Sequence, residues 1–270
     1  MHNNIAFINN KQGDRLEVHE DMEKEIKEYF QEILREPPGS RDQAIRTITQ
    51  HIPKIISEDH NNKLLQSVSL QEVEAAMVQL KDGKAPGPDE FTANFFREFW
   101  ELIKTKVWEL VEESRTMHWI LPSLNATFIV LVPKGEEPNT PDKYRPIALC
   151  NVIYRLISNV LANRLKALLP LLISSEQTGY VEGRQILDGI ILSNEVIHSL
   201  KILKKPSMIL KLDLSKAFNK FSWNYIHQML LAFGFNATWT RWIMNLITSP
   251  CFSVLLNGSP SSPFPSSRGI

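Results

Sequence analysis

The order in which helical and strand-like patterns follow one another limits this chain to a mixed architecture. Two runs of β-branched and aliphatic residues predict strands: Thr127-Phe-Ile-Val-Leu-Val132, which ends at Pro133, and Phe252-Ser-Val-Leu-Leu256, which leads into the hairpin signal Asn257-Gly258. A third strand is predicted at 208–213. Stretches with helical spacing lie between and around them, at 151–169, 186–200, 223–233 and 238–247. Because helices and strands mix without strict alternation, the expected fold class is α+β.

The first 69 residues are expected to form a peripheral lead-in. A small hairpin is predicted around Gly13-Asp14, and a helix with an apolar stripe from Met22 to Leu34 should end at Pro37-Pro38. The polar stretch 39–62 is expected to be partly mobile. Regular structure should resume at Ser69-Leu-Gln-Glu72, a capping box that begins the next helix.

Charge is distributed unevenly along a chain whose net charge is zero. Residues 1–69 carry nine basic against twelve acidic side chains, whereas residues 143–220 carry twelve against five. The second half could therefore line a phosphate backbone, although a solvated basic face is equally compatible with the count. The two cysteines, Cys150 and Cys251, are predicted to be free thiols of a reducing compartment. The N-terminus does not resemble a signal peptide, and charged residues interrupt the most apolar stretch, so an intracellular protein without a membrane segment is expected.

The segment Lys211-Leu-Asp213-Leu-Ser-Lys-Ala-Phe218 carries the most chemical information. In the predicted strand, Met208, Leu210 and Leu212 share one face, and Asp213 is the last residue on the opposite face. A carboxylate at the end of a buried strand needs a partner, for which a divalent metal ion is one candidate. The alternative is an exposed aspartate that caps the next element.

Four segments, in this order, resemble the reverse transcriptases of non-LTR (LINE-type) retrotransposons. Their residues are most similar to those of the plant elements of this family. They are Lys84-Ala-Pro-Gly-Pro-Asp89, Val132-Pro-Lys134 with Tyr144-Arg-Pro-Ile147, Gln177-Thr-Gly-Tyr-Val-Glu-Gly-Arg184, and Lys211–Phe218. The resemblance covers about residues 70–270. It implies a right-hand polymerase fold with helical fingers, a partial split-βαβ palm and no thumb. Residues 1–69 would be a connector, 70–205 the fingers-like region and 206–270 the partial palm.

The resemblance also implies a set of site residues. Asp213 would be the catalytic metal-binding aspartate, with the Leu214 backbone beside it, for two Mg2+ ions. The incoming dNTP would be held by residues of the fingers and of the Asp213 segment: Lys134, Arg145, Ser215, Lys216 and Phe218, the last as a steric gate against ribonucleotides. Core packing is the alternative role for Phe218. The template path would include Gln177, Gly179 and Arg184, for which turn stabilisation is the alternative. Five cations are expected on one side of the domain, facing the phosphates: Lys134, Arg145, Arg164, Lys166 and Arg184.

The sequence also departs from the family pattern. Asn219 stands where the family usually has aspartate, and Glu90 where it usually has glycine. The sequence contains no Asp-Asp pair, and one carboxylate cannot hold two divalent cations, so the chain is expected to be truncated and catalytically incomplete. The tail from Gly258 is expected to be poorly ordered. The family partners would be an RNA template and a DNA primer, with no membrane and no obligate protein partner. A non-catalytic RNA-binding or maturase-like remnant and an inactive relic are the alternatives.

Overall fold

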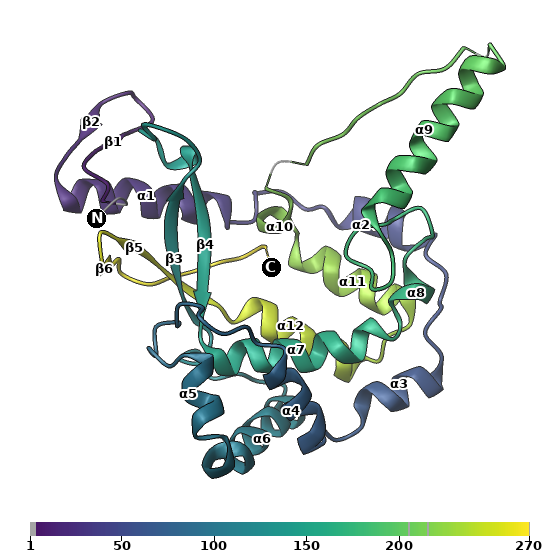
Figure 1. Ribbon diagram of the computed structural model, residues 1–270, viewed down its shortest axis with the longest axis horizontal. Coiled ribbons are helices and arrows are strands. Elements are labelled where there is room, and N and C mark those ends of the chain that lie inside the picture. Colours follow the sequence, from purple (N-terminus) through teal and green to yellow (C-terminus); the bar gives the residue numbers. More distant parts are fainter. Residues whose placement is uncertain (1–3, 205, 215, 270) are drawn as a thin grey trace.

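The computed structural model describes residues 4–204, 206–214 and 216–269 and has the mixed α+β architecture that the sequence predicts. Figure 1 shows the main sheet and helix α1 on one side of the molecule, with a group of helices below the sheet. Helix α9 projects from the opposite side. The apolar core is divided accordingly into one cluster on the sheet and another among the helices.

The main sheet is built around three longer strands, β3 (Ala126–Pro133), β4 (Tyr144–Cys150) and β5 (Cys251–Leu256). Two short strands, β6 (Ser259–Pro260) and β7 (Phe264–Pro265), complete the sheet. The strand order is β4-β3-β5-β6, and β7 also pairs with β5. β3 runs antiparallel to β4 and parallel to β5, so that Ile129 lies between Ala148 and Val254. The predicted strands at 127–132 and 252–256 are confirmed. The turn after β5 has positive φ at both Asn257 and Gly258, as its sequence predicts.

One face of this sheet is covered by the N-terminal segment. Burial alternates along β3, where Ile129 and Leu131 are buried against α1 (His19–Ile33), as the period of a strand requires. α1 contributes Ile26 and Phe30 to this cluster, which confirms the predicted apolar stripe. The predicted hairpin is also present, as the short strands β1 (Ile8–Asn9) and β2 (Arg15–Leu16). The other face of the sheet is more open, and Ile147 is exposed there.

The helical core surrounds α7 (Val152–Lys166), the best buried helix of the chain's described part. Its inward side chains recur at spacings of three and four, as in Val152, Leu156 and Val160. Residues from α12 complete this core, where the rings of Trp239 and Trp242 meet edge to face. The helices that pack around α7 or near it are α3 (Glu58–Leu65), α4 (Leu70–Val78), α5 (Ala93–Glu98), α6 (Trp100–Met117), α8 (Leu169–Leu172), α11 (Trp223–Phe233) and α12 (Ala237–Thr248).

The capping box at the start of α4 is confirmed. The Ser69 side chain accepts a hydrogen bond from the Glu72 backbone N–H at 3.2 Å, and the Glu72 carboxylate accepts one from the Ser69 N–H at 2.9 Å. Before it, the stretch 39–62 has more regular structure than the sequence suggests, since it contains α2 (Asp42–Thr49) and most of α3. α2 buries Ile45 and α3 buries Leu64. Because each helix buries a single aliphatic side chain, the polar composition of the stretch does not reveal either helix.

Arg164 is not the phosphate-facing cation that the sequence predicts. Its side chain is 9% exposed, and its guanidinium lies against the connection between α3 and α4. It donates two hydrogen bonds to the Glu72 carboxylate, at 2.7 and 3.0 Å, and three more to backbone carbonyls, those of Leu64, Gln66 and Ser67. All five donors of the guanidinium are thus occupied within the protein, so the expectation for this residue is wrong.

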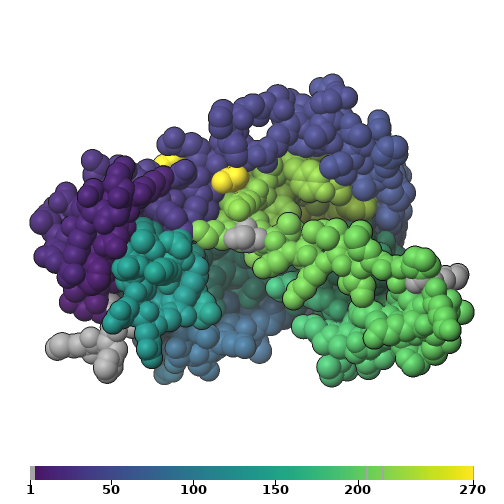
Figure 2. Space-filling view, turned by 90° about the horizontal axis from the view of Figure 1, so that it is seen from above, coloured from purple at the N-terminus to yellow at the C-terminus, as the bar shows by residue number. Residues whose placement is uncertain are grey.

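The predicted strand at 208–213 is also wrong. Residues 206–214 adopt no regular structure, and Met208, Leu210 and Leu212 are 87%, 71% and 77% exposed. The alternating pattern is present, but a strand forms only where a neighbouring strand accepts its hydrogen bonds, and none of the described residues pairs with this segment. Together with α9 (Ile186–Ile202), which buries no residue, the segment forms an apolar arm on the side opposite α1 (Figure 2).

The C-terminal tail is more ordered than its composition suggests. It forms β6 (Ser259–Pro260) and β7 (Phe264–Pro265), and Phe264 is buried on the sheet. The backbone N–H groups of Ser267 and Arg268 both donate to the Leu34 carbonyl, at 2.9 and 3.1 Å. The expectation of a poorly ordered tail is wrong because β5 itself serves as its partner strand.

Three other expectations concern the chain as a whole. Cys150 and Cys251 are free, as predicted, and both are half-buried. Among the described residues, no helix is both long and apolar enough to cross a membrane. The division at residues 69/70 and 205/206 stays a prediction, although α1 and β5 share one core cluster.

Candidate nucleotide and nucleic-acid site

The short helix α10 (Ala217–Lys220) is the point where segments distant in the sequence meet. Lys216 precedes it in the left-handed region, with φ +54°, and its Nζ donates a hydrogen bond to the Tyr29 hydroxyl of α1. The same ammonium lies 4.7 Å from the centre of the Tyr29 ring, a cation–π geometry. Burial lowers the pKa of Lys216, and the nearby Asp142 carboxylate opposes that effect.

Two of the predicted nucleotide-binding cations, Lys134 and Lys216, approach the same acidic residue. The Lys134 Nζ donates to the backbone carbonyl of Asp142 at 2.5 Å, in the connection between β3 and β4 that contains the 3-10 turn η1 (Pro141–Lys143). A hydrogen bond from the Thr140 hydroxyl, aided by the charges of Lys134 and Lys216, holds the pKa of Asp142 below its ordinary value. In the space-filling view, the teal β3–β4 connection abuts the purple N-terminal segment (Figure 2). The structure therefore brings both cations to Asp142, at the end of the sheet where β3 and β4 are connected.

Arg145, the third predicted cation, is exposed on β4 opposite Val132. Within the described chain it enters no ion pair. Because side chains alternate along a strand, Arg145 shares the open face with Ile147, away from α1. Its guanidinium is therefore free to meet a ligand on that face.

Phe218, the predicted gate, lies on the surface rather than in the core. Its ring is 52% exposed and meets the ring of Tyr180 edge to face, with 6.2 Å between the centroids. Tyr180 comes from the Gln177–Arg184 motif and is itself exposed with φ +64°. Two segments that the sequence singles out are thus in contact here. Core packing, the alternative role for Phe218, does not account for a ring that is this exposed.

The predicted template residues hold a turn together. Arg184 donates to the carbonyls of Ile173, Ser174 and Gln177, the first at 3.0 Å and the last at 2.7 Å. The Gln177 amide donates to the Gly179 carbonyl at 3.4 Å. These contacts fix the backbone beside Tyr180, and a role along a template path stays a prediction.

Asp213 and Leu214 lie in the exposed segment that precedes α10, and Ser215 lies outside the described residues. In the described part of the chain, no group of three or more His, Cys, Asp or Glu side chains could hold a metal ion. One exposed carboxylate with a neighbouring carbonyl does not meet the ligand requirement of two magnesium ions. The described residues therefore do not fit a two-metal centre by themselves.

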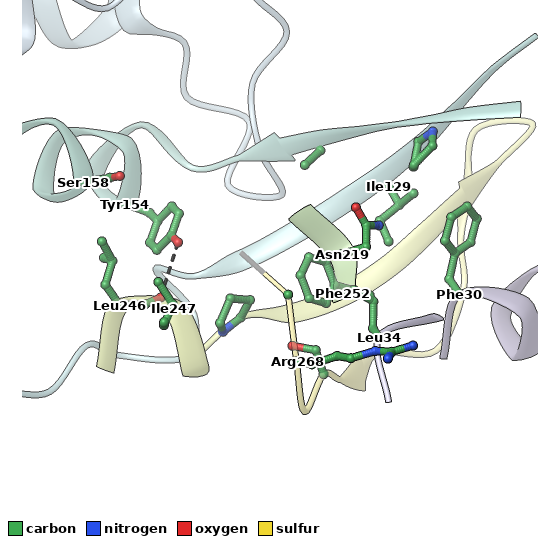
Figure 3. A pocket seen from close by; sticks show the side chains of 15 residues that line it. Phe30, Leu34, Ile129, Tyr154, Ser158, Asn219, Leu246, Ile247, Phe252 and Arg268 are labelled. Carbon is green, nitrogen blue, oxygen red and sulfur yellow. Dashed lines mark hydrogen bonds between the residues drawn. The ribbon is translucent and has the colours of Figure 1, made fainter. Parts of the chain in front are cut away.

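Asn219, one of the departures from the family pattern, lines a largely apolar cavity of about 300 Å³ between the sheet, α7 and the C-terminal tail. Figure 3 shows the Asn219 side chain beside Ile129 and Phe252, with Arg268 of the C-terminal tail nearby. The Arg268 Nε donates to the Ile33 carbonyl at 2.7 Å, and the Trp223 Nε1 donates to the Gly269 carbonyl at 2.7 Å. The tail thus forms one wall of the cavity beside Asn219.

The first of the four motif segments, the loop Lys84–Asp89, is locked against the start of α7. The Asn151 side chain accepts a hydrogen bond from the Asp89 N–H at 3.2 Å and donates one to the Ser123 carbonyl at 2.9 Å. A Cβ on Gly87 would lie 2.2 Å from Asn151 Oδ1, so only glycine allows this approach. Burial raises the pKa of Asp89.

Sequence reasoning missed three residues of the site: Tyr29, Asp142 and Tyr180. Tyr180 lies within a recognised motif, and an aromatic residue directly after Gly179 is a visible signal there. Asp142 is close to the Tyr144–Ile147 motif. Tyr29 gives no such signal, because an aromatic residue next to the apolar stripe of a helix is usually core.

Comparisons with known proteins identify the family of this chain. A family model described as reverse transcriptase (RNA-dependent DNA polymerase) matches residues 132–270, more than half of the chain. A 149 kDa protein of transposon TX1 from Xenopus laevis is 25% identical over 266 residues, which are 98% of this chain and 20% of that protein. The Pol polyprotein of the type-2 retrotransposable element R2DM from Drosophila melanogaster is 26% identical over 247 residues, 90% of this chain and 22% of the polyprotein. The chain spans about a fifth of the length of these curated relatives. It belongs to the reverse transcriptase family, of the type that non-LTR retrotransposons encode.

Proposed function

We propose that the protein to which this chain belongs copies RNA into DNA, and that this chain binds the triphosphate of the incoming deoxynucleotide. The observation that carries the proposal is the convergence of Lys134 and Lys216 on Asp142, from segments far apart in the sequence. Cations held in this way form charge-assisted hydrogen bonds to phosphate oxygens. Arg145 lies on the other face of β4, the edge strand of the sheet, and would reach the same phosphates around that edge as a planar donor.

The exposed ring of Phe218 supports a role at the sugar of the nucleotide. Lys216 and Phe218 flank the start of α10, so a triphosphate on Lys216 would bring its sugar toward that ring. The contact with Tyr180 holds the ring from one side. A ring in that position would crowd a ribose 2′-hydroxyl and favour deoxynucleotides. By the resemblance, Ser215 would also take part in binding the same triphosphate.

Magnesium would supply Lewis-acid activation in the whole protein. Asp213 and the Leu214 carbonyl would contribute to that site only together with carboxylates from elsewhere in the longer protein. In the same whole protein, 1–69 would be the connector, 70–205 the fingers and 206–270 the first part of the palm. An RNA template and a DNA primer would be its partners, with Gln177, Gly179 and Arg184 along the template path through the turn that Arg184 stabilises.

The test is nucleotide binding by the purified chain, measured by competition against a fluorescent deoxynucleoside triphosphate. Replacing both cations in Lys134→Ala/Lys216→Ala should weaken binding at least about 10-fold, since each charge-assisted hydrogen bond contributes roughly 1.5–3 kcal/mol. The matched control is Lys24→Ala/Arg46→Ala, which removes two exposed cations from α1 and α2. Equal affinities of the two variants would contradict the proposal. Phe218→Val should narrow the preference for a deoxynucleotide over the ribonucleotide.

RNA binding without catalysis is the second candidate function. It is favoured by the lone carboxylate at Asp213 together with the Arg145 guanidinium, which has no acidic partner among the described residues. Under this alternative, RNA would bind with the same affinity to Asp213→Ala and to the parent, and the triphosphate would bind to neither. An inactive relic would bind neither ligand.

A further inference from the structure

A row of apolar side chains lies on the surface of α5 and the start of α6, away from α10 and the site described above (Figure 1). Its members are Phe91, Phe95 and Phe99, which are 45%, 37% and 43% exposed, and Leu102, which is 80% exposed. The ring centroids lie 4.6 Å apart between Phe91 and Phe95 and 5.0 Å apart between Phe95 and Phe99. We call these four residues the phenylalanine row. We propose that the phenylalanine row docks an amphipathic helix of another protein, whose apolar stripe is bordered by lysine or arginine.

The helical core does not use the outer side of this row. α5 buries Ala93 and Phe96 in that core instead. The Phe96 ring meets the rings of Phe91 and Phe95 edge to face, with 6.3 and 5.7 Å between the centroids. The row therefore rests on the core through Phe96, while its outer side faces solvent. Adjoining exposed apolar side chains of this size mark interaction surfaces, and aromatic residues dominate the binding energy of protein interfaces.

Hydrogen bonds fix the backbone beneath the row before any partner binds. The Phe91 N–H donates to the Asp89 carboxylate at 3.1 Å. The Phe95 N–H donates to the hydroxyl of Thr92, the N-cap of α5, at 3.3 Å. The Phe99 N–H donates to the Phe95 carbonyl at 3.1 Å. A surface whose side chains are positioned in advance loses less conformational entropy on binding.

The charges beside the row are acidic on balance. Glu90 and Glu98 are exposed, and none of the ion pairs among the described residues includes either of them. Glu98 lies three positions after Phe95 and therefore on the same side of α5. The nearby cations already have acidic partners: Arg97 pairs with Asp82, Lys104 with Glu101, and Lys106 with Glu109. Two unpaired carboxylates beside an apolar row favour a partner whose apolar stripe is bordered by cations.

The same charges disfavour two other occupants of the row. The carboxylates of Glu90 and Glu98 repel the phosphates of a nucleic acid. A second copy that placed its own row against this one would bring like charges together, which opposes association. A helix fits the spacing of the rings instead. The 4.6 and 5.0 Å between centroids match the roughly 4.5–6 Å by which apolar side chains at i, i+3 or i+4, and i+7 follow one another along a helix.

The test is peptide binding by the purified chain, measured by fluorescence anisotropy. The probe is a labelled peptide of about 20 residues, long enough to form a helix, with leucine at i, i+4 and i+7 and lysine along the border of that stripe. Phe95→Ser/Phe99→Ser should bind it at least about 10-fold more weakly than the parent, because aromatic anchors dominate such interfaces. Glu90→Gln/Glu98→Gln should also bind it more weakly and with a smaller dependence on salt.

Two controls separate docking from unspecific adhesion. The same peptide with glutamate in place of lysine should bind the parent more weakly than the lysine peptide does. Leu187→Ser/Ile190→Ser removes two exposed apolar side chains from α9 and should bind the lysine peptide as the parent does. Urea unfolding of each variant checks its fold. The glutamine variant leaves the phenylalanine rings in place, so it tests the proposal even if the serine variant is less stable.

Several outcomes would overturn the proposal: a parent chain that does not bind the lysine peptide, equal binding of the lysine and glutamate peptides, or the same loss of affinity in the α9 variant as in Phe95→Ser/Phe99→Ser. Self-association of the parent that this serine variant abolishes would instead assign the row to a second copy. A loss of RNA affinity in the same variant would assign it to nucleic acid. Triphosphate binding should be unchanged in all these variants, so the row can fail while the Lys134–Lys216 site stands, and the reverse.

Discussion

Replacing Arg164 by alanine should destabilise the fold without touching either candidate site. The guanidinium joins the end of α7 to the connection between α3 and α4 by two hydrogen bonds to Glu72 and three to backbone carbonyls. Its removal leaves the carboxylate with the Ser69 N–H as its remaining donor and takes one donor from each of three carbonyls. We therefore expect α3 to separate from α7 more readily in the variant.

The magnitude follows from the exposure of the two partners. Breaking a buried ion pair costs roughly 3–5 kcal/mol, whereas a fully exposed pair contributes about 0–1 kcal/mol. Arg164 is 9% exposed and Glu72 is 36% exposed, so water can solvate the carboxylate but not replace the guanidinium. The intermediate value is about 2–3 kcal/mol for Arg164→Ala. Arg164→Lys keeps the charge but not the planar set of donors, so it should lose about half as much.

Equilibrium unfolding in urea is the appropriate assay, because a lower midpoint at unchanged slope reports a loss of stability alone. Lys166→Ala, two residues further along α7 and exposed, is the matched control and should unfold like the parent. A loss below about 0.5 kcal/mol for Arg164→Ala would refute the reasoning, because the guanidinium would then behave as an ordinary surface group.

Three further predictions concern acid, backbone packing and catalysis. Glu72 pairs with Arg164, and Glu112 of α6 pairs with Arg115. Burial opposes ionisation of both carboxyls, but the arginine partners outweigh it and hold both pKa values below the ordinary 4.5. This stabilisation is complete above that pH and is lost as the pH falls through the lowered values, so the melting temperature should drop on acidification, and less steeply in Glu72→Gln than in the parent. Gly87→Ala should destabilise the chain by about 1–3 kcal/mol in urea unfolding, whereas a parent-like midpoint would show that the loop can move away from Asn151. The chain should not extend a primer on an RNA template with magnesium or manganese, because Asp213 is its one carboxylate for the two metal ions. Extension that disappears in Asp213→Ala would show that this carboxylate suffices and would contradict the prediction.

Local signals in this sequence predicted local structure well. The hydrogen bonds of the Ser69 capping box need only four consecutive residues, and the apolar spacing of α7 needs only one helix, so both were visible in the sequence. The turn at Asn257-Gly258 was predictable for the same reason. The strand expected at 208–213 failed because pairing depends on a second segment, about which the alternation of Met208, Leu210 and Leu212 says nothing.

The candidate site was predicted as a set of residues but not as an arrangement. The resemblance pointed to Lys134 and Lys216, yet nothing in the sequence placed them around Asp142 and Tyr29. Arg164 shows the opposite error, because a basic residue on an amphipathic helix has the same sequence pattern whether it faces phosphate or a carboxylate of the protein itself. Only the packing of α7 against the α3–α4 connection decides between these roles.

The way the N-terminal segment covers the sheet has a consequence for how the chain folds during synthesis. The Asn257 side chain accepts a hydrogen bond from the Ile5 backbone N–H across 252 residues of sequence, and α1 packs on β5, which pairs with β3. At about 5–20 residues per second, the ribosome needs roughly 13–50 s to make that interval. During this time α1 and β3 expose their apolar faces, because the strand that completes their core has not yet been made. Contacts at such long range also slow folding, so we expect the nascent chain to depend on chaperones until β5 leaves the ribosome.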